Sequence, residues 1–159
     1  MPKLDLDSIP QSNATGYPDE HAGPVAGRWY RRLAPASGLS HFGASHVVLK
    51  PGAWSSQRHW HDGEDELLVM LSGEAVLVED ANDDNGGRTV LGPGDVCAWP
   101  QGIANGHHLR NESDADCCFL VISGGTRAGG GYSDIDMTFT ADNRYLHRDG
   151  TEYPGARRV

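Results

Sequence analysis

The chain has 159 residues, of which 38% are hydrophobic and 22% charged, a composition typical of one folded domain with a substantial core. Its 22 acidic residues outnumber its 13 basic ones, and the net charge of −9 disfavours binding to nucleic acid or an anionic membrane surface. No apolar run approaches the roughly 18 residues that a membrane-spanning helix requires, and the polar N-terminus lacks a signal-peptide core. We therefore expect a cytoplasmic protein whose partner is a small molecule.

The two ends of the chain differ from its middle. Residues 1–25 contain few apolar side chains and several Pro, Gly, Ser and Asp, which predicts an N-terminal arm. This arm either lies over the folded domain or over a partner subunit, or it is a disordered terminus. The folded domain is expected over residues 26–140, followed by a polar C-terminal tail over residues 141–159.

Short apolar or alternating runs, separated by turns rich in glycine and proline, follow one another through the domain. The predicted strands are 27–33, 46–50, 55–61, 66–71, 74–79, 89–91, 96–99, 107–110, 117–123 and 135–140. The Gly-rich segment 126–132 is predicted to be a loop, and no helix of ten or more residues is expected. Many short strands with frequent turns favour an all-β sandwich or small barrel.

The segment 52–73, GAWSSQRHWHDGEDELLVMLSG, contains the strongest candidate site. His59 and His61 are separated by one residue, so on a strand both imidazoles point to the same face. Glu66 opens the apolar run that follows, and its carboxylate lies beside the histidines if the two runs pair as antiparallel strands. Two neutral imidazoles and one carboxylate suit a divalent metal ion such as Zn, Fe, Mn, Ni or Co.

Two residues near this cluster are candidates for contact with a bound substrate. Gln57 lies two residues before His59, where it can share the face of that histidine. Met70 shares the face of Glu66 and would give a pocket an apolar wall. The alternative for both residues is that they only fill the interior of the domain.

The order of Gly52, His59, His61, Glu66 and Gly73 resembles the first sequence motif of the cupins. The family pattern is glycine, five residues, His-x-His, three or four residues, Glu, six residues, glycine. This chain departs from the pattern at one place, because six residues rather than five separate Gly52 from His59.

The second cupin motif is glycine, five residues, Pro-x-Gly, two residues, His, three residues, Asn. It is matched by Gly94, Pro100, Gly102, His107 and Asn111, although four residues rather than two precede the histidine. His107 keeps the family spacing to Asn111, and adjacent strand residues face opposite ways, so it competes with His108 for one position. A bulge at the insertion would favour His108 as the alternative metal ligand.

The resemblance implies a double-stranded β-helix, or jelly-roll barrel, that holds one divalent metal ion inside. The implied ligands are His59, His61, Glu66 and His107. Open coordination positions fit an isomerase, lyase, hydrolase or dioxygenase acting on a small organic molecule, and a shared fold does not select among these reactions. The alternative is a non-catalytic cupin that binds or senses a small ligand.

A homodimer is also expected, because edge strands of small barrels are usually covered. The N-terminal arm and the strand predicted within residues 28–33 are the candidates to provide this cover across a two-fold axis.

Overall fold

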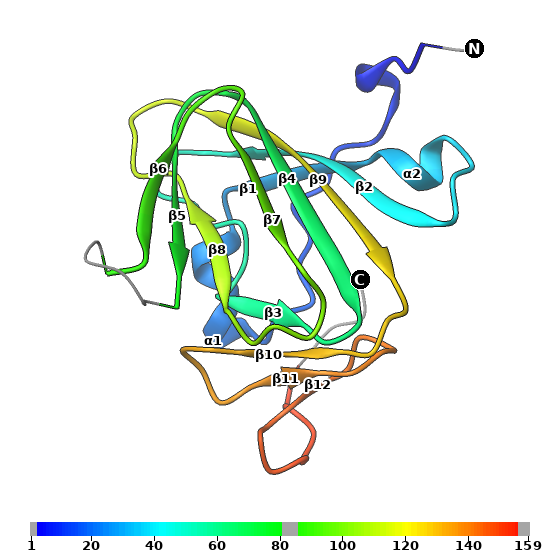
Figure 1. Cartoon of the computed structure of the whole chain (residues 1–159), viewed down its shortest axis with the longest axis vertical. Helices are drawn as coiled ribbons and strands as arrows, with labels where there is room; N and C mark the ends of the chain where they lie inside the picture. Colours follow the sequence, from blue (N-terminus) through cyan, green and yellow to red (C-terminus); the bar gives the residue numbers. More distant parts are fainter. Residues whose placement is uncertain (1–2, 81–85, 156–159) are drawn as a thin grey trace.

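The structure is a computed structural model of the chain, and it describes residues 3–80 and 86–155. Two antiparallel sheets face each other across the core (Figure 1). Five strands form one sheet in the order β1-β2-β9-β4-β7, and seven form the other in the order β12-β11-β10-β3-β8-β5-β6. The predicted all-β barrel of two facing sheets is confirmed.

The five-stranded sheet provides one wall of the core. Its strands are β1 (Arg28–Arg32), β2 (Phe42–Leu49), β9 (Cys117–Gly125), β4 (Glu64–Ser72) and β7 (Val96–Trp99). Side chains alternate between the faces of a strand, so Leu49, Met70 and Phe119 are all buried on the inner face. They pack against Leu77 and Leu109 of the opposite sheet within one hydrophobic cluster.

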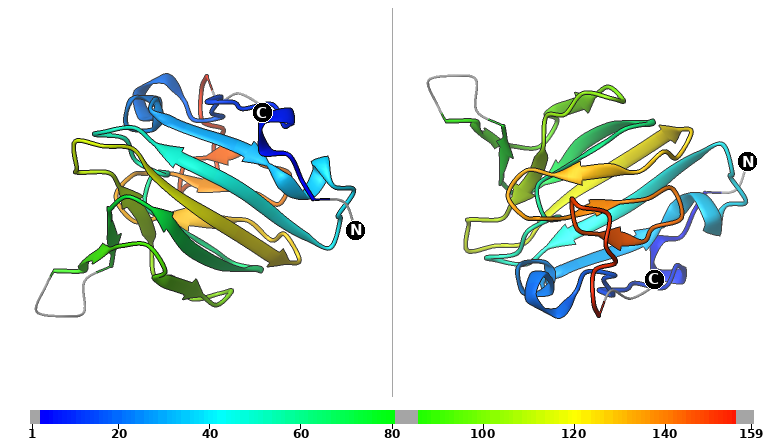
Figure 2. Two further views of the ribbon diagram at one scale, coloured as in Figure 1. Left: turned by 90° about the horizontal axis from the view of Figure 1, so that it is seen from above. Right: turned by 90° about the horizontal axis from the view of Figure 1, so that it is seen from below.

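The seven-stranded sheet provides the other wall. Its strands are β12 (Tyr145–Leu146), β11 (Thr138–Phe139), β10 (Gly130–Tyr132), β3 (His59–His61), β8 (His107–Arg110), β5 (Ala75–Glu79) and β6 (Arg88–Leu91). The helical segments are the short η1 (Leu6–Ser8), α1 (Asp19–Ala22), η2 (Gly23–Val25) and α2 (Leu33–Ala36). Figure 2 shows the C-terminal strands β10, β11 and β12, coloured orange, lying across one end of the barrel. No described helix is long and apolar enough to cross a membrane.

Gly73 carries the chain from one sheet to the other, between β4 and β5. Its φ of +72° lies in the left-handed region, which only glycine adopts readily. A Cβ at this position would lie 2.6 Å from the carbonyl oxygen of Asp116, so the turn also has no room for a side chain. This glycine closes the first of the two sequence motifs.

The antiparallel pairing of β3 with β4, the condition stated for bringing Glu66 beside the histidines, does not form. β3 pairs with β8 and β10, whereas β4 pairs with β7 and β9 in the opposite sheet. Glu66 nevertheless faces the histidines, because the inner faces of the two sheets point toward each other. The short turn between the strands therefore crosses from sheet to sheet instead of forming a hairpin within one sheet.

The Gly-rich segment 126–132 is not a loop throughout, because it contains β10. Gly130 and Gly131 pair with His61 and Trp60 of β3. A Cβ on Gly131 would lie 2.3 Å from the Trp60 ring, so only glycine permits this close approach. The composition that suggested a loop thus reflects a strand packed tightly against bulky neighbours.

The described parts of the N-terminal arm and of the C-terminal tail both pack on the barrel. In the N-terminal arm, Ser12 exchanges two backbone hydrogen bonds with Tyr30 of β1, at 3.0 and 2.8 Å. Tyr17 is buried and stacks on Tyr145 of β12, with the ring centroids 5.4 Å apart. Of the alternatives stated for the arm, its described part thus takes the one in which it lies over the folded domain of its own chain.

Candidate metal centre

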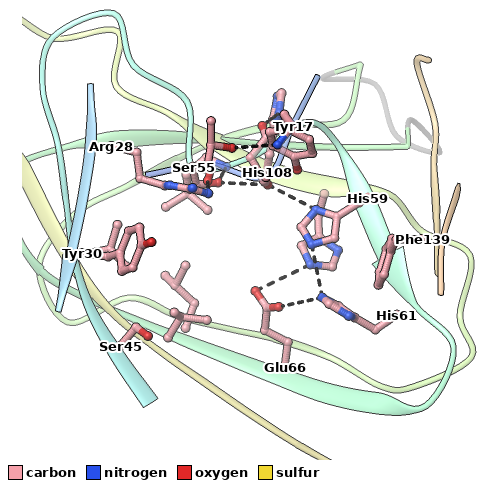
Figure 3. Close-up of a pocket in the computed structure, with 18 of the residues that line it drawn as sticks. Tyr17, Arg28, Tyr30, Ser45, Ser55, His59, His61, Glu66, His108 and Phe139 are labelled. Carbon is pink, nitrogen blue, oxygen red and sulfur yellow. Dashed lines mark hydrogen bonds and ion pairs between the residues drawn. The ribbon is translucent and has the colours of Figure 1, made fainter. Parts of the chain in front are cut away.

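The strand order gathers three imidazoles on the inner face of the seven-stranded sheet. His59 on β3 lies directly opposite His107 on β8, and His61 shares the face of His59 by alternation. Glu66 reaches toward them from β4 in the facing sheet. Figure 3 shows the Glu66 carboxylate directed at the imidazoles across the pocket.

The nitrogen and oxygen atoms of this group converge closely. His59 Nε2 lies 3.2 Å from His61 Nε2, which lies 3.3 Å from Glu66 Oε2. His59, His61 and Glu66 each place a possible ligand atom within 4.8 Å of the others, so the three can hold a metal ion. His107 Nε2 is 3.8 Å from Glu66 Oε1 and adjoins this group without belonging to the tight set.

Backbone carbonyls orient two of the rings. The Nδ1 atom of His59 lies 2.9 Å from the Gln57 carbonyl oxygen, and that of His107 lies 3.0 Å from the Asn105 carbonyl oxygen. Donation from Nδ1–H to a carbonyl leaves Nε2 as the nitrogen with a free lone pair, the arrangement common for metal-binding histidine. Trp99 stacks on the His107 ring with centroids 3.9 Å apart and planes 5° apart, which fixes that ring further.

The protonation states suit a metal ion. Burial, together with the neighbouring His61 and His107, lowers the pKa of His59 to about 3, so the ring is neutral at physiological pH. Burial alone would raise the pKa of Glu66, but its contacts with His107 and His61 outweigh burial and hold the pKa well below its usual range. Neutral imidazole and ionised carboxylate are the forms that bind a divalent cation.

One buried atom gives independent support for a metal ion at this cluster. The Nε2 atom of His107 has no hydrogen-bond partner among the described residues, although it is buried and aimed at the cluster. Buried polar nitrogens are rarely left unpaired, so such an atom calls for a partner that the protein itself does not supply. A metal ion at the cluster would be that partner, and the donor set fits one.

His108 lies on the other face of β8 and is differently placed. Its Nδ1 lies 2.9 Å from the Ser56 carbonyl oxygen, and its Nε2 accepts a hydrogen bond of 2.9 Å from Arg110 Nε. Both ring nitrogens are therefore engaged. The strand phase that brings His107 to the cluster accordingly turns His108 away from it, into a buried position beside Trp54.

The cluster opens onto a cavity of about 390 Å³ inside the barrel. Sequence reasoning did not single out several residues that line it, namely Tyr17, Arg28, Tyr30, Tyr132, Phe139 and Tyr145. For Arg28 and Tyr30 a signal was present, because they lie two residues apart in the predicted strand 27–33 and so share a face. The tyrosines of the arm and tail had no such signal, since short polar segments do not reveal where they dock.

The two predicted substrate-contacting residues lie away from this cavity wall. Gln57 is buried, and its side-chain amide donates to the His21 carbonyl oxygen at 2.8 Å. Met70 is fully buried in the hydrophobic cluster, one alternation beyond Leu68, which does line the cavity. A contact between either residue and a ligand has no support in this geometry.

These features together define a jelly-roll barrel with an inward-facing cluster of histidine and glutamate. Residues 45–123 match the Cupin domain family. A solved structure from Silicibacter pomeroyi, described as a sugar phosphate isomerase from the cupin superfamily, is 39% identical and covers 96% of both chains with a TM-score of 0.86. The chain belongs to the cupin superfamily.

Two further relatives are more distant. A solved structure from Acidithiobacillus ferrooxidans, described as a putative sugar phosphate isomerase, is 22% identical over 82% of this chain and 81% of that chain, with a TM-score of 0.67. An oxalate-binding protein from Thermotoga maritima is 34% identical over 76 residues, which are 48% of this chain and 56% of that protein. The former likeness shows the fold alone, and the latter spans little more than half of the relative.

The geometry predicts different effects of replacing the two adjacent histidines. We expect His107→Ala to lower metal affinity at least about tenfold, or about 1.4 kcal/mol, because it removes a nitrogen aimed at the cluster. His108→Ala should have a much smaller effect, since both nitrogens of His108 are engaged elsewhere. Metal titration of the two chelator-treated variants and of His59→Ala measures these affinities. Loss of metal from His108→Ala alone would contradict the assignment.

The buried histidines also predict how the stability of the metal-free protein depends on pH. Burial lowers the pKa of His59 to about 3 and that of His108 to about 4, whereas both titrate near 6.5 in the unfolded chain. Between these values the unfolded chain binds more protons, so the free energy of unfolding is highest above about pH 6.5 and falls as the pH drops toward 4. Urea unfolding in chelator at about pH 7.5 and about pH 5 measures this fall, which His108→Gln should reduce. Equal unfolding midpoints at both pH values would contradict the prediction.

Proposed function

We propose that this cupin is a metal-dependent enzyme that isomerises a small sugar phosphate inside the barrel. The observation that carries the proposal is the group His59, His61 and Glu66 at the wall of a cavity of about 390 Å³, a size typical of small-molecule sites. The 39% identity to a chain described as a sugar phosphate isomerase, over 96% of both chains, supports this reaction. A cytoplasmic location belongs to the proposal, and the three unpaired cysteines are consistent with it.

In this proposal His59, His61 and Glu66 hold the divalent ion, and His107 is the fourth ligand. The ion would supply Lewis acidity to a carbonyl or hydroxyl oxygen of the substrate. Isomerisation of an aldose to a ketose moves protons between neighbouring carbons and between their oxygens. The residues around the cavity must therefore exclude bulk water and hold or deliver a proton.

Tyr17 is the candidate proton donor. Its hydroxyl oxygen accepts hydrogen bonds from the Gln57 backbone N–H at 3.2 Å and from the Tyr132 hydroxyl at 3.3 Å. With two donors at the oxygen, the hydrogen of Tyr17 is free to point at a ligand in the cavity that this residue lines. Burial raises the pKa of Tyr17, so the hydroxyl stays protonated at neutral pH and keeps a hydrogen to donate to a substrate oxygen.

The second candidate is a non-catalytic cupin in which the metal anchors a small ligand. The 34% identity to an oxalate-binding protein, over 76 residues or about half of this chain, favours this alternative. A binding protein and an enzyme use the same cluster, so the static geometry suits both. A measurement of substrate turnover distinguishes the enzyme from the binding protein.

The test uses protein purified without chelator and incubated with an aldopentose phosphate or an aldohexose phosphate. We expect ketose phosphate to form, and we expect chelation or Glu66→Gln to reduce the rate at least about tenfold, since both weaken the metal centre. Proton NMR in deuterated water follows the product and any exchange of substrate hydrogen. Glu112→Gln is the matched control, because Glu112 pairs with Arg88 at the surface.

Undiminished turnover in fully metal-free protein would contradict the proposed metal dependence. Tight binding of either phosphate with no conversion would favour the binding protein instead.

We also propose that the protein is a homodimer formed through the outer face of the five-stranded sheet. Leu67, Leu71 and Val96 point outward there with 37%, 46% and 59% of their surface exposed. A sheet face with several exposed apolar residues is typical of an interface between subunits. Light scattering should give twice the 17.1 kDa mass of one chain.

Val96→Lys should shift this mass toward that of the monomer. The matched control is Val90→Lys, because Val90 is 61% exposed but lies on β6 of the other sheet. A monomeric wild-type protein at micromolar concentration would contradict the proposal, and equal effects of both lysine variants would place the interface elsewhere.

A further inference from the structure

Strand β1 contributes a row of polar side chains to the cavity wall. Arg28, Tyr30 and Arg32 alternate along the strand and all line the cavity. Figure 3 shows Arg28 and Tyr30 entering the pocket from the side opposite His61 and Phe139. The cavity therefore has two chemically different ends, with the cluster of imidazoles and carboxylate at one and the guanidinium groups of β1 at the other.

The Arg28 guanidinium is held in place but its charge is not balanced. Its Nη1 donates to the Ser55 carbonyl oxygen at 2.9 Å and its Nη2 to the Ala14 carbonyl oxygen at 3.4 Å. Its Nε is buried and has no hydrogen-bond partner among the described residues. Arginine stays protonated at any physiological pH, so this site retains a positive charge and a spare donor.

The neighbouring residues do not neutralise it. Within the described part of the chain neither Arg28 nor Arg32 forms an ion pair, whereas Arg31, on the other face of β1, pairs with Asp7 at 3.4 Å. Both cavity-facing guanidinium groups lie beside the Tyr30 ring, at 5.4 and 5.6 Å from its centroid. The Tyr30 ring therefore contacts a guanidinium group from each of its two neighbours on this face of β1.

The described cavity wall has no carboxylate available to pair with these arginines. Among its described lining residues Glu66 is the sole carboxylate, and it lies against the imidazoles of the cluster. The protein carries a net charge of −9, so a pocket end lined by unpaired arginine stands out from its acidic surroundings. Leaving a partly buried cation unpaired costs free energy that an anionic ligand would offset.

We propose that Arg28, assisted by Arg32, is the subsite for the anionic group of the ligand. The group is a phosphate or a carboxylate, both of which match the planar donor arrangement of guanidinium. This inference rests on the proposed function for the identity of the remaining part of the ligand. It adds the direction of binding, in which the anionic end lies at β1 and the oxygen-bearing, reacting end lies at His59, His61 and Glu66.

The direction of binding has a chemical consequence. In a sugar phosphate bound this way the phosphate is remote from the cluster, so the carbonyl carbon and its neighbour are the atoms presented to it. Arg28 then acts in positioning and specificity, and it takes no part in the proton transfers.

The test measures binding of inorganic phosphate and of acetate to the metal-loaded protein and to its metal-free form by calorimetry. The metal-free form excludes direct coordination of the probe. We expect a saturable phosphate site in both forms, weakened at least about tenfold in Arg28→Gln, which corresponds to about 1.4 kcal/mol. Arg28→Lys, which keeps the charge, should retain part of the affinity.

The matched control is Arg31→Gln, because Arg31 lies one residue from Arg32 on the same strand but faces the arm, where its Nε donates to the Ile9 carbonyl oxygen. We expect it to bind phosphate as the wild-type protein does. Melting temperature and metal content of each variant separate loss of the subsite from loss of the fold or of the metal.

Two results would overturn the inference: no binding of either anion to wild-type protein, or equal binding to wild type and Arg28→Gln. Binding of acetate in preference to phosphate would support the anion subsite and identify a carboxylate ligand, which would contradict the proposed sugar phosphate. Absence of isomerase turnover with an intact Arg28-dependent phosphate site would leave the subsite standing and remove the proposed reaction, so the two failures are distinguishable.

Discussion

Glu66 lies on one sheet and His59, His61 and His107 lie on the other, so their approach spans the interior of the barrel. Burying a carboxylate costs free energy unless nearby groups stabilise its charge. Here the imidazoles do so, and the contacts keep the carboxyl ionised despite its burial. The cluster is possible because the two sheets pack as rigid faces around a shared apolar core, which fixes the distance between β3 and β4.

A ring of neighbouring contacts holds His107 in its orientation. Trp99 stacks on the imidazole, and its indole nitrogen donates to Glu79 Oε1 at 2.8 Å. The same oxygen accepts from the Asn105 side chain at 3.0 Å, and the Asn105 carbonyl oxygen lies 3.0 Å from His107 Nδ1. A closed set of contacts thus links four residues from three strands and a loop, and it holds the His107 imidazole in place. Such support is what a metal ligand requires, because a rotated imidazole would lose its alignment with the cluster.

Local periodicity predicted much of this arrangement, and non-local pairing accounts for what it missed. The alternation of His59 and His61, and the opposite phases of His107 and His108, follow from the two-residue repeat of any strand. No local pattern indicated that β3 and β4 lie in different sheets, because the same short turn can join strands of one sheet or of two. The strand around Gly130 was also not predicted, because its glycines make room for Trp60, which is distant in the sequence. Arg28 lies in a predicted strand, but which face of β1 points inward depends on the whole fold.

The cluster and the rest of the cavity wall come from different parts of the chain, which explains why the cluster is easier to predict than a ligand. The segment matching the Cupin domain, residues 45–123, contains every member of the cluster. Arg28 and Tyr17 precede this segment, and Tyr132 and Tyr145 follow it, yet all four line the same cavity. The shared core can therefore keep the histidine and glutamate cluster while the flanking segments change the shape and charge of the opposite wall. The arm, β1 and the C-terminal strands therefore supply the part of the cavity wall that lies outside the shared core. The similarity to the 39% identical chain covers 96% of both chains, so it extends over those flanking segments as well.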